Sequence, residues 1–191
     1  MFLQEPNSVE AREYLDKEKS ATGYVMDLDR GWAWRPDVAE AFANLRKQLL
    51  DGSTLSPRER AVLVCAQAHA LGDSYCATVW GARLAELAGA AAAGDVLRGD
   101  EPSVLSAREA ALRRWAAQVV RAPNEIQGPD IDALRSVGLA EREIFEATAF
   151  VAFRLAFATV NDALGAKPDA QLVAAAPPEV RTAITYGRPQ A

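Results

Sequence analysis

Alanine accounts for 39 of the 191 residues, and this excess constrains the fold more than any other feature of the chain. Alanine has the highest helix propensity, whereas the β-branched and aromatic residues that favour strands are modest in number. No segment shows the period-two alternation of apolar and polar residues that marks a half-buried strand. The sequence therefore predicts an all-α protein, long enough to form one domain whose core needs no disulfides.

Helix-start and helix-stop residues divide the chain into segments. Ser56 with Glu59, and Ser106 with Glu109, have the spacing of a capping box, and Pro36 is suited to a first helical turn. The segment 141–164 is apolar on nearly all sides, as in a central core helix or a subunit interface. We expect helices over 8–20, 37–50, 57–71, 75–88, 91–98, 107–121, 130–136 and 141–164.

Three parts follow from this pattern. Residues 1–35 form an N-terminal arm with an extended segment, in which Trp32 and Trp34 anchor the chain to the body. Residues 36–166 form the helical domain. Residues 167–191 form an Ala- and Pro-rich tail with one short helix near Glu179.

Charge and composition limit the classes of partner. The net charge is −5 and the pI is near 5.0, so we expect no nucleic acid partner, because phosphate binding needs a basic stripe. No apolar run reaches the roughly 20 residues of a membrane span. The acidic N-terminal segment lacks the basic-then-apolar layout of a signal peptide. We expect a cytoplasmic protein that does not bind membranes.

The segment 55–81 carries the candidate chemistry, because both cysteines and the only histidine lie in it. Cys76 falls in the first turn of a predicted helix, where the positive end of the helix dipole favours a thiolate. Burial as a small apolar side chain is the alternative for a free cysteine. No nucleotide-binding glycine motif and no HExxH zinc motif occurs, and we expect no cofactor.

This segment resembles the AhpD-like alkylhydroperoxidase / carboxymuconolactone decarboxylase superfamily, in its peroxidase-related branch. The residues that carry the resemblance are 55–59 (Leu-Ser-Pro-Arg-Glu) and 71–81, which contains Tyr75-Cys76 and ends at Gly81. The order of elements from about residue 23 to residue 166 is also similar. The resemblance implies an AhpD-like helical bundle, a homo-oligomer and peroxide chemistry at a Cys-x-x-Cys pair assisted by a Glu and a His.

Three of those four groups are replaced in this chain. The second cysteine of the pair falls on Cys76, but the first falls on Asp73, the histidine on Trp80 and the glutamate on Ala61. One thiol cannot close an intramolecular disulfide, and an indole accepts no proton. The resemblance therefore implies a peroxidase-related redox protein whose peroxidase activity is lost or altered.

Nearby residues offer replacements for the missing groups. Ala61, Cys65 and His69 lie four residues apart and share one helix face. Cys76 is thus the candidate reacting thiol, His69 a candidate base and Cys65 a candidate resolving thiol. The alternative is that Cys65 and His69 only pack between helices.

Two further interpretations concern ligands. Cys65, His69, Asp73 and Cys76 form a formal metal-ligand set, but a helix break falls inside it and no CxxC pair anchors it, so we expect no metal. Tyr75 and Trp80 are the candidate residues for lining a pocket beside Cys76.

Arg154 is unusual in an apolar helix, because an unpaired buried arginine is costly. It pairs across a subunit interface or binds a carboxylate, and we expect self-association through 141–164. Besides the redox protein, with an external thiol reductant and an unidentified small-molecule substrate, two classes of function stay open. These are a non-redox decarboxylase-like enzyme acting on a small organic acid or lactone, and an inactive oligomeric binding or structural relative.

Overall fold

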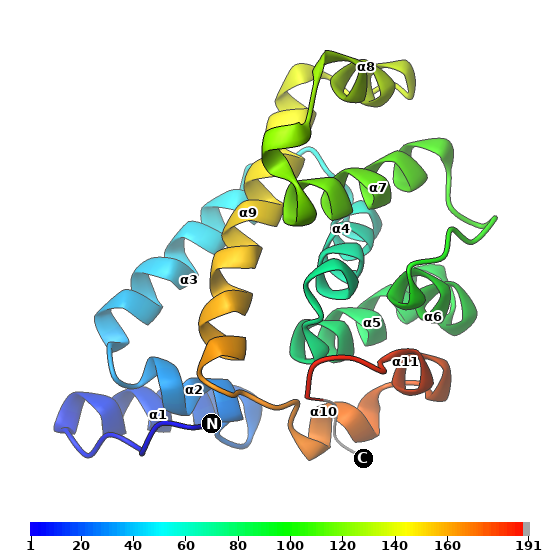
Figure 1. Ribbon diagram of the computed structural model, residues 1–191. Helices are drawn as coiled ribbons and strands as arrows, with labels where there is room; N and C mark the ends of the chain where they lie inside the picture. The colour runs from blue at the N-terminus through cyan, green and yellow to red at the C-terminus, as the bar shows by residue number, and fades with distance from the viewer. Residues whose placement is uncertain (189–191) are drawn as a thin grey trace.

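The computed structural model describes residues 1–188, and within that range it contains helices and no strands. This confirms the all-α prediction. Figure 1 shows the helices in order along the chain. Their bounds are α1 Val9–Thr22, α2 Asp27–Trp32, α3 Pro36–Asp51, α4 Pro57–Leu71, α5 Ser74–Ala88, α6 Ala90–Arg98, α7 Ala107–Arg121, a 3₁₀ turn Pro123–Glu125, α8 Gly128–Ser136, α9 Glu141–Ala163, α10 Ala170–Ala175 and α11 Pro178–Ala183.

Helix starts follow the predicted caps. The Ser56 hydroxyl accepts a hydrogen bond from the backbone N–H of Glu59, and the Glu59 carboxylate accepts one from Ser56 N–H. Ser106 and Glu109 repeat the arrangement at α7. Each box supplies partners to backbone donors that a helix start leaves unpaired.

The prediction of an extended segment over residues 23–36 is wrong, because these residues contain the short helix α2. The Asp29 carboxylate accepts a hydrogen bond from Met26 N–H at 3.1 Å and so caps the helix from its own first turn. Trp32 stacks on Phe157 at 5.3 Å, whereas Trp34 is 52% exposed. The tail also differs from the prediction, with two short helices, α10 and α11, instead of one.

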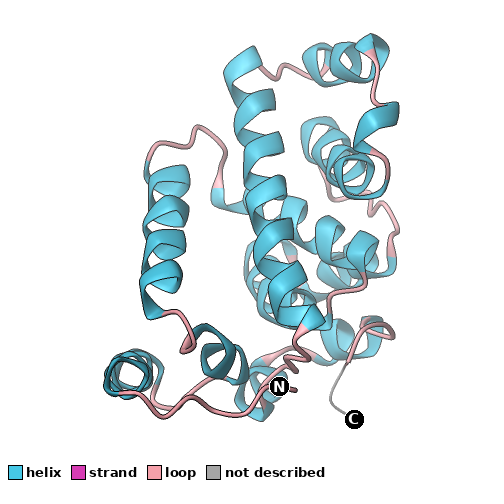
Figure 2. Cartoon of the chain, turned by 60° about the vertical axis from the view of Figure 1, so that its left-hand side comes forward, coloured by secondary structure: helices cyan, strands magenta, loops and turns pink. Residues whose placement is uncertain are grey.

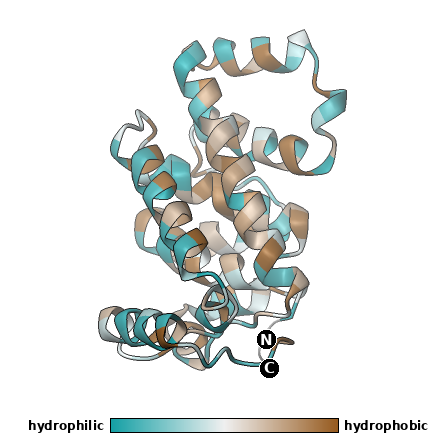
Figure 3. Ribbon diagram, turned by 90° about the vertical axis from the view of Figure 1, so that its left-hand side faces the viewer, coloured by the Kyte–Doolittle hydropathy of each residue, from teal (hydrophilic) through white to brown (hydrophobic). Residues whose placement is uncertain are grey.

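The core is built around α4, whose residues 61–68 are all buried. Helices α5, α6, α7 and α9 pack against it. Figure 3 shows apolar and polar residues mixed along the outer helices, as amphipathic helices require. Because α4 is covered on all sides, the position of α5, which follows it after a short turn, is set by the core.

Helix α3 lies at the side of the molecule, next to α9 (Figure 2). None of its residues is buried. Phe42 provides its main contact, stacking on Phe157 at 5.4 Å between ring centres. The long helix α9 has one face in the core and carries exposed apolar residues on its other side. Among residues 1–188, no helix is both long and apolar enough to cross a membrane.

An arginine of each capping box forms an ion pair with the glutamate of the other box. Arg58, in the first box, pairs with Glu109 of the second at 2.7 Å, and Arg108, in the second, pairs with Glu59 of the first at 2.5 Å. Arg108 also pairs with Glu143 of α9. These largely buried ion pairs hold the starts of α4, α7 and α9 together.

We predict that Arg108→Gln lowers the free energy of unfolding by about 1–3 kcal/mol, because it leaves two partly buried carboxylates without their cation. Urea unfolding followed by circular dichroism measures the change. The control is Arg135→Gln, which breaks the exposed pairs with Asp132 and Glu141 and is expected to cost about 0–1 kcal/mol. Equal losses of unfolding free energy in the two variants would contradict a special role for the ion pairs between the capping boxes.

Candidate functional site

Cys76 lies in the first turn of α5, as predicted. Helix α4 ends at Gly72 in the left-handed conformation, and Asp73 is the N-cap of α5. The Asp73 carboxylate accepts a hydrogen bond from the backbone N–H of Cys76 at 2.9 Å. The local task of the Asp73 carboxylate is therefore to start α5, and its correspondence to the first cysteine of the family pair stays a prediction.

Arg154 of α9 is the direct partner of the Cys76 thiol. Its Nη2 donates to Cys76 Sγ at 3.2 Å, and its guanidinium carbon lies 5.2 Å from the centre of the Trp80 ring and 5.6 Å from that of Phe157. Arg154 is 7% exposed. Within the chain, the Arg154 guanidinium therefore contacts a thiol and two aromatic rings, and its pairing across a subunit interface stays a prediction.

Opposing effects act on the Cys76 thiol. Burial raises the pKa of Cys76 well above its usual value, the Arg154 guanidinium lowers it, and the Asp73 carboxylate raises it further. Burial is the largest of these effects. The thiol thus lies between a carboxylate able to take a proton and a cation able to stabilise a thiolate.

Cys65 lies on α4 and is fully buried. Burial raises the pKa of its thiol, and both cysteines are free. The two side chains belong to the same core cluster. The role of Cys65 as a resolving thiol stays a prediction.

His69 is not brought into contact with Cys76. Its Nδ1 is hydrogen bonded to the Leu97 carbonyl at 2.9 Å, and its ring meets the edge of Tyr186 at 5.6 Å. These contacts favour the interpretation that His69 only packs between helices over the interpretation that it acts as a base. Among residues 1–188, no three His, Cys, Asp or Glu side chains gather as a metal site would need.

The other predicted positions are distributed as follows. Trp80 stacks on Arg154 one turn after Cys76, as the shared helix face predicts. Tyr75 is buried beside Leu28, with its hydroxyl donating to Asp169 at 2.7 Å. Ala61 is buried in the core. The nearby Glu59 is committed to its cap and to Arg108.

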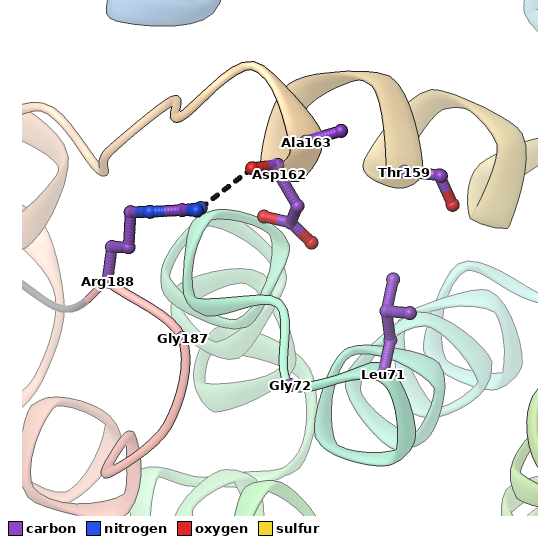
Figure 4. Close-up of a pocket in the computed structure, with 7 residues that line it drawn as sticks. All are labelled: Leu71, Gly72, Thr159, Asp162, Ala163, Gly187 and Arg188. Atoms are coloured by element: carbon purple, nitrogen blue, oxygen red, sulfur yellow. Dashed lines mark hydrogen bonds between the residues drawn. The ribbon is translucent and has the colours of Figure 1, made fainter. Parts of the chain in front are cut away.

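A pocket of about 450 Å³ lies next to the α4–α5 turn (Figure 4). We call it the C-terminal pocket, because the chain end forms one wall. Arg188 N–H donates to Ser74 Oγ at 2.9 Å, and Arg188 Nη1 donates to the Asp162 carbonyl at 2.7 Å. Gly187 passes so close to Gly72 that an added Cβ would lie 2.5 Å from its carbonyl oxygen. The residues that line the C-terminal pocket are Leu71, Gly72, Thr159, Asp162, Ala163, Gly187 and Arg188.

Asp162 is the titratable acid of this pocket. Burial raises its pKa to about 7, the charge of Asp73 adds to the shift, and Arg188 opposes it. The electrostatic partners of Asp162 lie 89 residues before it and 26 residues after it, and no local pattern predicts that they meet.

Comparisons with known proteins identify the fold. No protein-family model and no curated protein matches the sequence. Two similar structures, each 24% identical to this chain, are of uncharacterized peroxidase-related proteins. The one from Ralstonia eutropha JMP134, described as an alkylhydroperoxidase AhpD core, has a TM-score of 0.73 over 90% of this chain and 94% of that one. The one from Silicibacter sp. TM1040 has a TM-score of 0.77 over 90% and 93%.

The debrominase Bmp8 is a third similar structure, 16% identical, with a TM-score of 0.72 over 93% of this chain and 95% of that one. The chain therefore has the AhpD-like all-α fold, as the resemblance implied. In this chain, Arg154 and Asp73 both contact Cys76 at the start of α5.

We predict that Asp162 makes stability depend on pH. Its pKa is about 7 in the folded protein against 3.8 ordinarily, so the native state retains a proton that the unfolded state has lost. Stability contributed by this group is complete below pH 4 and is lost as pH rises through 7. Thermal unfolding should show Asp162→Asn more stable than wild type at pH 8, by on the order of 1 kcal/mol after screening, and equal to it near pH 4. The exposed Asp16→Asn is the control, and a pH-independent difference would contradict the assignment.

Proposed function

We propose that this protein is a one-cysteine thiol redox protein, in which Cys76 reacts with a peroxide and Arg154 stabilises the thiolate. The single observation that carries the proposal is the hydrogen bond from Arg154 Nη2 to Cys76 Sγ. A guanidinium held beside sulfur favours the anion and also attracts the electronegative oxygens of a peroxide. The similar peroxidase-related structures support the same class of chemistry through the fold alone.

The reaction is balanced without a second cysteine. The Cys76 thiol transfers its proton to the Asp73 carboxylate as the sulfur attacks one peroxide oxygen. The O–O bond breaks, and the leaving oxygen takes that proton, giving an alcohol or water. The product is a sulfenic acid on Cys76, which an external thiol reduces by forming a mixed disulfide and releasing water. A second external thiol then attacks the outer sulfur of this mixed disulfide, so that Cys76 leaves as a thiol and the two external thiols are joined in a disulfide.

We predict that one equivalent of peroxide produces a sulfenic acid on Cys76 that reacts with dimedone, with one thiol lost per chain. Mass spectrometry locates the adduct, and Cys76→Ser is expected to abolish it while Cys65→Ser retains it. Loss of two thiols with a Cys65–Cys76 disulfide would instead establish Cys65 as the resolving thiol. No adduct and no lost thiol would contradict the proposed function.

A binding protein without turnover is the second candidate, and the burial of Cys76 favours it. The side chain is 3% exposed, and burial raises its pKa. Both features describe an inert structural thiol. The peroxide experiment separates the candidates, because an inert thiol survives it unchanged.

We further propose that the protein assembles with itself through α9. Phe145 and Val160 are large apolar residues exposed on that helix. Phe145 is 72% exposed, and burial of such a side chain in a contact between copies removes its apolar surface from water.

Light scattering coupled to size exclusion tests this assembly. We predict that the double change of Phe145 and Val160 to Glu converts an oligomer into a monomer, because it places charge in an apolar contact. Val104→Glu, at an exposed loop residue, is the control and leaves the mass unchanged. A monomeric wild type would contradict assembly.

A further inference from the structure

A narrow crevice between α3 and α9 has Arg154 in its lining. We call it the α3–α9 crevice. Its walls come from the two helices alone, and its lining is apolar apart from two arginines. The lining residues are Phe42, Leu45, Arg46, Leu49, Phe150, Phe153 and Arg154.

The guanidinium at this crevice is only partly satisfied. Arg154 uses Nη2 for Cys76, but its Nε is buried and has no hydrogen-bond partner among the described residues. A buried donor without a partner is costly, and more so when it carries charge. The structure therefore retains an unused cationic edge at the inner end of an apolar crevice.

The charge of the lining selects the sign of a ligand. Arg46 is exposed on α3 and Arg154 is buried on α9, and no Asp or Glu is among the lining residues. Three phenylalanines and two leucines form the rest. A compatible ligand carries one negative group and a flexible apolar body.

From these observations we propose that the α3–α9 crevice binds a medium-chain monocarboxylate, with its carboxylate on the Nε edge of Arg154 and its alkyl chain between α3 and α9. An arginine edge is well shaped for a carboxylate. The site shares Arg154 with the proposed peroxide chemistry but does not depend on that chemistry, since the ligand uses the Nε of Arg154 and the thiol contact uses Nη2.

Helix α3 is the wall that moves. The crevice has about 10 Å³ of free volume, which is about the space of one water molecule. No residue of α3 is buried, so α3 itself contributes only half-covered or exposed side chains to this contact, while Phe150 and Arg154 on the α9 side are buried. The alkyl chain of the ligand then replaces those apolar contacts. Regions with few buried contacts are the ones that open most readily.

Isothermal titration calorimetry with octanoate, acetate and octanol tests the proposal. We expect saturable binding of octanoate, none of acetate, which lacks the apolar body, and binding of octanol weaker by about tenfold or more. Nuclear Overhauser contacts should join the alkyl protons to the rings of Phe42 and Phe153. Acetate binding as tightly as octanoate, or no saturation by octanoate, would overturn the proposal.

Two variants separate the charge from the cavity. Arg154→Leu should remove the preference for octanoate over octanol, and Leu45→Trp, which fills the crevice while Arg154 stays intact, should weaken octanoate by about tenfold or more. Circular dichroism confirms that each is folded, and Arg121→Gln, an exposed arginine elsewhere, is the control. If Leu45→Trp binds octanoate as wild type does, the ligand lies elsewhere and the proposal fails whatever Arg154→Leu shows. Peroxide reactivity of Cys76 is not a readout here, so failure of this site leaves the proposed function untouched.

Discussion

The reciprocal ion pairs between the two capping boxes are the interaction on which the rest of the structure depends. Arg58 reaches Glu109 and Arg108 reaches Glu59, so the first turns of α4 and α7 fix each other in position. Each glutamate also accepts a backbone N–H at its own helix start. Local capping and long-range pairing thus use the same carboxylates, and moving one helix would break both. Because α4 is buried on all sides, its position determines where α5 begins.

The start of α5 places two charged groups of opposite sign beside one sulfur. Asp73 lies before Cys76 in the chain, and Arg154 arrives from α9. A carboxylate and a guanidinium therefore set the electrostatic environment of the Cys76 thiol. The aromatic faces of Trp80 and Phe157 hold the guanidinium in place through cation–π contacts.

The chain end completes this region from the outside. The segment around Gly187 and Arg188 crosses the α4–α5 turn and binds the end of α9. It therefore couples the two helices that carry Cys76 and Arg154. The raised pKa of Asp162 follows from the same closure, because the segment helps to bury a carboxyl near Asp73. The C-terminal pocket is consequently polar and titratable, whereas the lining of the α3–α9 crevice is apolar and cationic.

The sequence by itself determined the helices, because capping boxes, glycine stops and apolar periodicity act within one or two turns of chain. It also placed Cys76 at a helix start and Trp80 on the same face as Cys76, for the same local reason. These local signals did not predict the helix α2 in segment 23–36, since α2 is capped by Asp29 and held by Trp32 against α9. Only the tertiary structure decided which long-range partners meet. His69 shares a helix face with Cys65, yet packing turns it to Leu97 and Tyr186. Arg154, 78 residues from Cys76, takes the place beside the thiol, because a buried arginine must find a partner and the packing of α9 against the core supplies a sulfur.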